Sequence, residues 1–461
     1  MRMTGWGAAA LLLLAGVAVA AQPGFVERFK AATAAYEARD YARMEAELRE
    51  ALELRPAHPT ATYRLAAAQA LRGQPDAALD TLAVLADMGL VFDPGADDDF
   101  AALKGQRAFG SVRRTFARNR EPRGSAGRVF RLGSPTFIPE GIAYDEDRRH
   151  FYVGSVHERR IQRVLRDDTE LDFVKPGDGL WAVLGMAADT RRNLLWVATA
   201  AIPEMRDARP DELGRSALVA YRLKSGERKH RFVLDDGPGP HLLGDVLVHE
   251  DTVYATDSRA GVLYALDAKA GPGQGKFRAL TRPGELSSPQ GMALSRRKDH
   301  LYVADYTQGL FRYALDGGKL ERLEVASGIS VYGIDGLYRY GDDLIAIQNG
   351  VRPHRVVRLQ LGDRGRRVRS LRVLAANLKA FDEPTLGVVV GKEFYFVANS
   401  QWQRFDDQHR LPPPDQLKRP QILRVKLDEA DARGPGVGPE RTPPPQPLPL
   451  PGPAPCIPPL C

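Results

Sequence analysis

The chain has 461 residues, with 65 Lys and Arg against 58 Asp and Glu, and a formal net charge of +7. Basic and acidic residues are interspersed, as in RDARPDELGR at 206–215, and no nucleic-acid-binding motif accompanies the excess of positive charge. We therefore expect no DNA or RNA partner.

The N-terminus has the layout of a secretory signal peptide. Arg2 precedes the apolar run GAAALLLLAGVAVA at 7–20, which ends in the small-residue pattern Ala18-Val19-Ala20. The run is shorter than the 18 or more apolar residues of a membrane span, so we expect no membrane span. Residues 1–20 are predicted to be cleaved, and the mature protein to be secreted or periplasmic.

Residues 25–118 have the periodicity of α-helices. DYARMEAELREALELRP at 40–56 and PDAALDTLAVLADMG at 75–89 place apolar residues three and four apart. The offset from Ala42 to Ala77 is 35 residues, close to the 34-residue period of tetratricopeptide (TPR) repeats, which the first segment resembles. About two repeats fit, fewer than a stable array needs, so this TPR-like segment is expected to pack on the next domain. Such repeats also present surfaces to other chains, so a protein partner is predicted here.

Residues 127–430 repeat one pattern six times, a glycine-containing step followed by three short apolar strands. Units of 40 to 50 residues with such strands are typical of β-propeller blades, so the fold class predicted is mainly β, a six-bladed β-propeller after an α-helical segment. The extra strand GRVFRLG at 127–133 would complete the sixth blade and close the ring. A β-sandwich is the alternative. The equivalent first positions of the six units are Glu140, Leu184, Gly244, Gln290, Asp335 and Leu386.

Residues 431–461 form a proline-rich tail that includes PPPQPLPLPGPAP at 443–455, and we expect the tail to be disordered. The only cysteines, Cys456 and Cys461, lie in this tail. The folded body therefore has no disulfide and no thiolate metal site.

The six equivalent positions should converge at one mouth of the central channel, because the first strand of each blade lines that channel. Glu140, Asp335 and the carbonyl of Gln290 are then hard oxygen donors of the kind that calcium prefers. The ends of the second strands return to the same mouth, and the segment carrying His241 enters blade three there. A polar ligand cup with candidate general bases is therefore predicted at this mouth.

Four segments resemble the SMP-30/gluconolactonase family, which includes luciferin-regenerating enzymes and is related to paraoxonases. They are PEGIAYD at 139–145, LGDVLVHEDTVYATDS at 243–258, SPQGMALSRRKDHLYVADY at 288–306 and GIDGLYRYGDDLIAI at 333–347. The resemblance implies a six-bladed propeller with a divalent cation on the channel axis. Its family ligands are a glutamate in blade one, asparagines in blades three and four, and an aspartate in blade five.

Carried over to this chain, the resemblance keeps part of that ligand set. Glu140 and Asp335 match in type and place, Gln290 replaces the fourth-blade asparagine with a longer amide, and Gly244 lacks the third-blade ligand. Asp245 matches the aspartate that follows in the family, although strand alternation turns it away from its neighbour's direction. Asp335 is also implied as a proton acceptor.

Two functions remain open at this point. The first is an exported, calcium-dependent or otherwise divalent-metal-dependent hydrolase of lactones or related esters, acting on a small molecule at the channel mouth. The second is a non-catalytic binding or protein-interaction propeller that has lost part of its metal site, with the histidines only capping loops. For the first, the predicted metal ligands are Glu140, Gln290 and Asp335, the catalytic residues are Asp335, His354 and His241, and the pocket-lining residues are His157, Asp245, Asn349 and Trp402.

Overall fold

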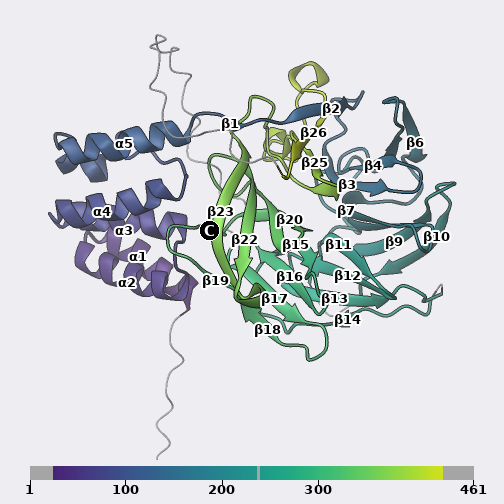
Figure 1. Ribbon diagram of the computed structural model, residues 1–461, viewed down its shortest axis with the longest axis horizontal. Coiled ribbons are helices and arrows are strands. Elements are labelled where there is room, and N and C mark those ends of the chain that lie inside the picture. Colours follow the sequence, from purple (N-terminus) through teal and green to yellow (C-terminus); the bar gives the residue numbers. More distant parts are fainter. Residues whose placement is uncertain (1–23, 236–238, 272, 429–461) are drawn as a thin grey trace, which may run out of the picture.

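The computed structural model describes residues 24–235, 239–271 and 273–428 (Figure 1). The predicted signal peptide at 1–20 and the proline-rich tail with both cysteines lie outside the described residues. Within the described ranges, no helix is both long enough and apolar enough to cross a membrane.

The N-terminal segment is helical. Asp40 caps the second helix by accepting a hydrogen bond from the Arg43 amide at 3.0 Å, and prolines begin the third and fourth helices, where a missing N–H costs nothing. The two helices predicted at 40–56 and 75–89 are confirmed as α2 and α4. The elements are α1 (Phe25–Glu37), α2 (Tyr41–Leu54), α3 (Pro59–Leu71), α4 (Pro75–Asp87), a 3-10 helix (Asp98–Leu103) and α5 (Arg107–Asn119).

The rest of the described chain forms six sheets arranged as propeller blades, with the inner strands around a common centre (Figure 1). All pairings between these strands are antiparallel except one short parallel pairing at the outer edge of blade five. Blade one has β3 (Pro139–Asp145), β4 (His150–Ser155), β5 (Ile161–Val164) and β6 (Glu170–Val174), and blade two has β7 (Ala182–Asp189), β8 (Leu194–Ala200), β9 (Ser216–Arg222) and β10 (Arg228–Val233). Blade three has β11 (Leu243–His249), β12 (Thr252–Asp257), β13 (Val262–Asp267) and β14 (Arg278–Ala279), and blade four has β15 (Pro289–Leu294), β16 (His300–Asp305), β17 (Gly309–Ala314) and β18 (Leu320–Arg322).

Blades five and six complete the ring. Blade five has β20 (Ile334–Tyr340), β21 (Asp343–Gln348), β22 (Arg355–Gly362) and β23 (Arg367–Ala376), extended by β1 (Arg123–Gly124) and β19 (Glu324–Val325). Blade six has β24 (Gly387–Val390), β25 (Glu393–Val397), β26 (Gln421–Lys426) and the upstream strand β2 (Gly127–Arg131). Because β2 pairs with β26, the predicted closing strand is confirmed, and the fold is a six-bladed β-propeller and not a sandwich.

A β-bulge recurs in the inner strand of each of blades one to five. The pairing register with the second strand shifts between Pro139 and Ile142 in blade one and between Ile334 and Leu337 in blade five, and blades two, three and four shift at the corresponding residues. The two residues inside each bulge are the repeated pair found in the sequence. A bulge re-aims a side chain away from the regular alternation, so the first residue of the pair is set apart in each of these blades.

The glycine of the repeated pair is required by the close approach of neighbouring blades. A Cβ built on Gly185 would lie 2.7 Å from the Gly244 carbonyl oxygen, and one on Gly291 would lie 2.5 Å from the Asp335 carbonyl oxygen. At Gly185 and Gly291 adjacent bulges therefore pack backbone against backbone and leave no room for a side chain, whereas blade three has Asp245 at this position.

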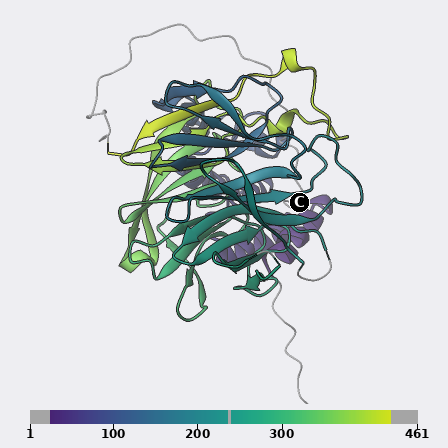
Figure 2. The same ribbon diagram turned by 90° about the vertical axis from the view of Figure 1, so that its right-hand side faces the viewer.

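The helical segment lies beside blade five (Figure 1), and Figure 2 shows it behind the blades when the molecule is turned. Arg55 donates to the Thr307 carbonyl at 3.0 Å, the Tyr332 hydroxyl donates to the Pro56 carbonyl at 3.0 Å, and buried Arg355 donates to Met88 O at 2.9 Å. The helices and the propeller thus form one packed body, as expected for a segment too short to be an independent array.

Candidate functional site

Glu140 and Asp335 are neighbouring buried carboxylates. They occupy the bulges of blades one and five, and each residue is only 9% exposed. Burial raises the pKa of Glu140 well above its usual value, and the Asp335 charge raises it further. Burial also raises the pKa of Asp335. The charge of Asp335 thus acts on Glu140, while the convergence of the six positions at one channel mouth stays a prediction.

One oxygen of each carboxylate is oriented by a neighbouring donor. Trp402 Nε1 donates to Glu140 Oε2 at 2.6 Å, and Asn349 Nδ2 donates to Asp335 Oδ2 at 2.6 Å. No described side chain forms an ion pair with either carboxylate, and no hydrogen bond from the described residues reaches Glu140 Oε1 or Asp335 Oδ1. Each carboxylate is thus held in place with one oxygen left to accept another partner.

Gln290 occupies the same position in blade four and faces the glycine of blade three. Its Nε2 donates to Ser288 Oγ at 3.1 Å, and its Oε1 would lie 3.5 Å from a Cβ built on Gly244. The additional methylene of glutamine therefore brings the amide oxygen into the space that a larger residue at 244 would use.

These donors suit a divalent cation in their chemistry. Two buried carboxylates without a counter-cation and one amide carbonyl provide the hard oxygen ligands that calcium prefers. In metal sites, hydrogen bonds such as those from Trp402 and Asn349 typically orient the carboxylates that bind the metal. Within the described ranges, no three His, Cys, Asp or Glu side chains converge closely enough to hold a metal ion by themselves. A cation at this place would need the Gln290 carbonyl and oxygens from water or substrate. The predicted metal set stays a prediction.

Glu383 is a third buried carboxylate of this region, and its position gave no signal in the repeated sequence pattern. It is 9% exposed, and its Oε2 has no hydrogen-bond partner within the described part of the chain. Burial, and then the charge of Asp335, raise the pKa of Glu383 to about 7, although Arg352 acts in the opposite direction. Its backbone φ of 63° is unusual for a non-glycine residue. Glu383 precedes β24 in the segment that enters blade six, and a search of the blade-entry segments for acidic residues would have found it.

The loop that carries Asn349 is held by both the propeller and the helical segment. The Tyr306 hydroxyl donates to Asn349 Oδ1 at 3.1 Å, which fixes the amide that binds Asp335. Further along the loop, the Val91 amide donates to the Arg352 carbonyl at 2.7 Å. The α-helical segment therefore supports the loop next to the axial carboxylates.

His241 is an oriented imidazole. Its Nδ1 lies 2.7 Å from Asp257 Oδ2, and Asp257 is fully buried. Its Nε2 is buried and has no hydrogen-bond partner in the described residues. A carboxylate on one ring nitrogen fixes the tautomer and leaves the other nitrogen as an acceptor, which is the arrangement of a general base.

The other predicted histidines are engaged differently. His354 Nε2 is hydrogen-bonded to the Arg352 guanidinium, and burial followed by the charge of that guanidinium lowers the pKa of His354 to about 3. His157 Nδ1 is hydrogen-bonded to the Glu204 carbonyl at 2.7 Å, and burial lowers the pKa of His157. These environments favour His241 over His354 as the base, while the catalytic assignments themselves stay predictions.

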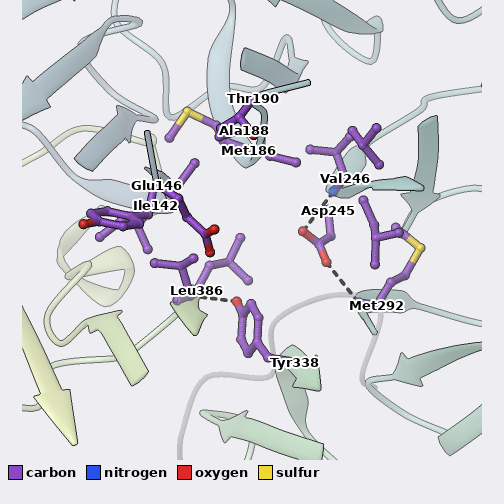
Figure 3. A pocket seen from close by; sticks show the side chains of 17 residues that line it. Ile142, Glu146, Met186, Ala188, Thr190, Asp245, Val246, Met292, Tyr338 and Leu386 are labelled. Atoms are coloured by element: carbon purple, nitrogen blue, oxygen red, sulfur yellow. Dashed lines mark hydrogen bonds between the residues drawn. The ribbon is translucent and has the colours of Figure 1, made fainter. Parts of the chain in front are cut away.

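Asp245 is a buried carboxylate held by backbone amides. Its two oxygens accept hydrogen bonds from the amides of Val246 at 2.8 Å and Met292 at 2.9 Å, so it ties blade three to blade four. It lines a cavity further along the channel (Figure 3).

The sequence matches no family model and no curated protein. Solved structures with a similar fold include a luciferin-regenerating enzyme, which is 14% identical over 66% of this chain and 95% of that chain, with a TM-score of 0.46. The PQQ-bound aldose sugar dehydrogenase from Streptomyces coelicolor is 14% identical over 66% of this chain and 99% of its own, with a TM-score of 0.45. A gluconolactonase from Xanthomonas campestris is 15% identical over 66% and 99%, with a TM-score of 0.43. Similar propellers thus include proteins named for different chemistries, and the likeness assigns no activity to this chain.

Proposed function

We propose that this chain is an exported, divalent-metal-dependent hydrolase of lactones or related esters, with calcium the preferred cation. The observation that carries the proposal is the pair Glu140 and Asp335, two buried carboxylates that are oriented by hydrogen bonds yet have no counter-cation among the described residues. Burying two like charges side by side destabilises a fold unless a cation or a function compensates for it. The segments that resemble the SMP-30/gluconolactonase family support the same reaction class.

Within this proposal each residue has one role. Glu140, Gln290 and Asp335 would hold the cation, which supplies Lewis-acid polarisation of a carbonyl oxygen or a water of lowered pKa. Trp402 and Asn349 each hold one carboxylate oxygen, which leaves the other oxygen of Glu140 and of Asp335 available to a cation. His241, oriented by Asp257, accepts a proton at Nε2, and Asp335 is the second candidate acceptor.

The first test is thermal unfolding of the mature protein, stripped with chelator and titrated with calcium, magnesium, manganese and zinc. A cation at about 100 times its dissociation constant stabilises the native state by about 2.7 kcal/mol, which the scan resolves. The double variant Glu140→Gln/Asp335→Asn should lose this increase. The exposed pair Glu324→Gln/Asp342→Asn near the same blade is the matched control and should keep it.

A cation-dependent increase that only the axial variant loses supports the site, and the loaded protein is then screened with lactones and esters. No increase with any of the four cations would contradict the proposal. An increase that the axial variant retains would also contradict it, because the cation would then bind elsewhere.

A non-catalytic ligand-binding propeller is the second candidate, and Gly244 is the residue that favours it because the blade-three ligand is absent. That function predicts small-molecule binding at the channel mouth without turnover. Turnover of any lactone or ester that depends on Glu140 would eliminate it. The protein partner of the helical segment stays a prediction under both functions.

A further inference from the structure

A cavity of about 390 Å³ lies in the channel toward the mouth opposite the axial carboxylates. It is formed by the later residues of the inner strands, from Ile142 in blade one to Val388 in blade six, and Figure 3 shows it from close by. Neither Glu140 nor Asp335 lines this cavity. Its lining residues are therefore distinct from the three proposed cation ligands, although the charge of Asp335 still acts on Asp245.

The charged groups of the cavity all have the same sign. Figure 3 shows the carboxylates of Asp245 and Glu146 on different sides of the space. Glu146 directly follows β3 in the sequence. None of the described lining residues is Lys, Arg or His. Because the field inside a low-dielectric channel is focused, this arrangement attracts cations.

The Asp245 carboxylate is built to accept further hydrogen bonds. Asp245 is 9% exposed, and its two oxygens accept one backbone amide each, from Val246 and Met292. Burial raises the pKa of Asp245 to about 7, so this carboxylate is mostly ionised only above that pH. An ionised carboxylate has about four lone-pair positions, and each oxygen can then accept another donor from within the cavity. The backbone amides hold the carboxylate in one orientation, which lowers the entropy lost when a ligand binds.

Apolar side chains form part of the wall between the two carboxylates, next to polar surface. Met186 and Met292 contribute polarisable thioethers and Tyr338 contributes a ring whose hydroxyl accepts a hydrogen bond from the Gly387 amide at 2.7 Å (Figure 3). Apolar walls strip water from a small solute, and aromatic rings and thioethers tolerate a nearby cation. A hydrated inorganic ion would gain little from such walls, whereas an organic cation would bury its hydrocarbon part against them.

We propose that this cavity binds a small primary ammonium compound with an apolar body, whose ammonium group lies against Asp245 and whose hydrocarbon part packs on Met186, Met292 and Tyr338. Glu146 contributes attraction at the entrance.

The test is titration calorimetry on the mature full chain at pH 8, above the raised pKa of Asp245, in the presence of chelator. Phenethylammonium is the probe and 2-phenylethanol is its neutral counterpart. The ammonium compound should bind about ten-fold more tightly than the alcohol, because the charged donor is the group that Asp245 accepts. Glu146→Gln should weaken the ammonium compound about two- to five-fold, the range for an exposed charge pair.

Two further variants keep the result interpretable. Asp147→Asn removes a neighbouring exposed carboxylate that does not line the cavity, and it should leave the affinity unchanged. Ala188→Phe fills the space from a lining position and should abolish binding, with unfolding curves confirming that the variant folds.

Equal affinity for the ammonium compound and the alcohol would overturn the proposal, because the carboxylates would then play no part. An equal loss in Asp147→Asn and Glu146→Gln would overturn it as well, since the effect would come from general surface charge. Unchanged binding in folded Ala188→Phe would place the ligand elsewhere and also refute it.

Discussion

Replacing Glu383 by Gln should stabilise the cation-free protein at pH 8. Burial, and then the charge of Asp335, raise the pKa of Glu383 from 4.5 to about 7. The folded state therefore binds a proton more tightly than the unfolded state does, and stability falls as the pH rises from about 4.5 to about 7. Glutamine has no charge to lose, so the variant does not undergo this fall.

The size of the effect follows from the pKa difference. A shift of about 2.5 units corresponds to about 3 kcal/mol at pH 8, where the buried carboxylate is ionised in both states. At pH 5 most of the penalty is absent, because Glu383 is still protonated in the folded protein, and the difference should shrink to about 1 kcal/mol.

The assay is guanidinium unfolding of wild type and Glu383→Gln at pH 5 and pH 8 with chelator present. Glu324→Gln is an exposed change of the same type, and its difference in unfolding free energy from wild type should be the same at both pH values. A Glu383→Gln protein that is less stable than wild type at pH 8 would refute the argument. An increase in the unfolding free energy of the same size at both pH values would refute the argument too, because the stabilisation would then be unrelated to the ionisation of Glu383.

Three further changes test other contacts. Trp402→Phe removes the 2.6 Å hydrogen bond to Glu140 and should weaken calcium binding about ten-fold in a calorimetric titration. Unchanged calcium affinity would show that Trp402 does not orient the carboxylate. For any lactone found by screening, His241→Gln should lower kcat by about two to four orders of magnitude and leave the calcium-dependent thermal shift unchanged. An unchanged kcat would exclude His241 as the base. Tyr332→Phe removes the hydrogen bond to the Pro56 carbonyl and should cost about 1 kcal/mol, seen as faster amide exchange in the helical segment, while unchanged exchange would argue against this contact.

Much of the fold could be predicted from the sequence because the signals are local. The apolar spacing of α2 and α4 and the strand pattern repeated in six units are properties of short segments, and each becomes the element it indicates. The closing strand β2 was predictable for a different reason, since a six-unit ring with a missing outer strand leaves an open sheet edge. The phase of the repeat also identified Glu140, Gln290 and Asp335 as equivalent positions, and the recurring bulges agree with that assignment.

The chemistry around those positions depended on contacts that no local pattern contains. Trp402 binds Glu140 across 262 residues of sequence, and Glu383 reaches the same region from a loop outside the repeat. The pairing of His241 with Asp257 and the cavity beside Asp245 likewise come from segments that meet only when the ring has closed. Sequence periodicity determines which face of a strand is buried, whereas loop paths and blade-to-blade packing decide which polar groups share a buried space. The sequence by itself therefore determined the blades and their axis, and the tertiary structure decided which side chains surround it.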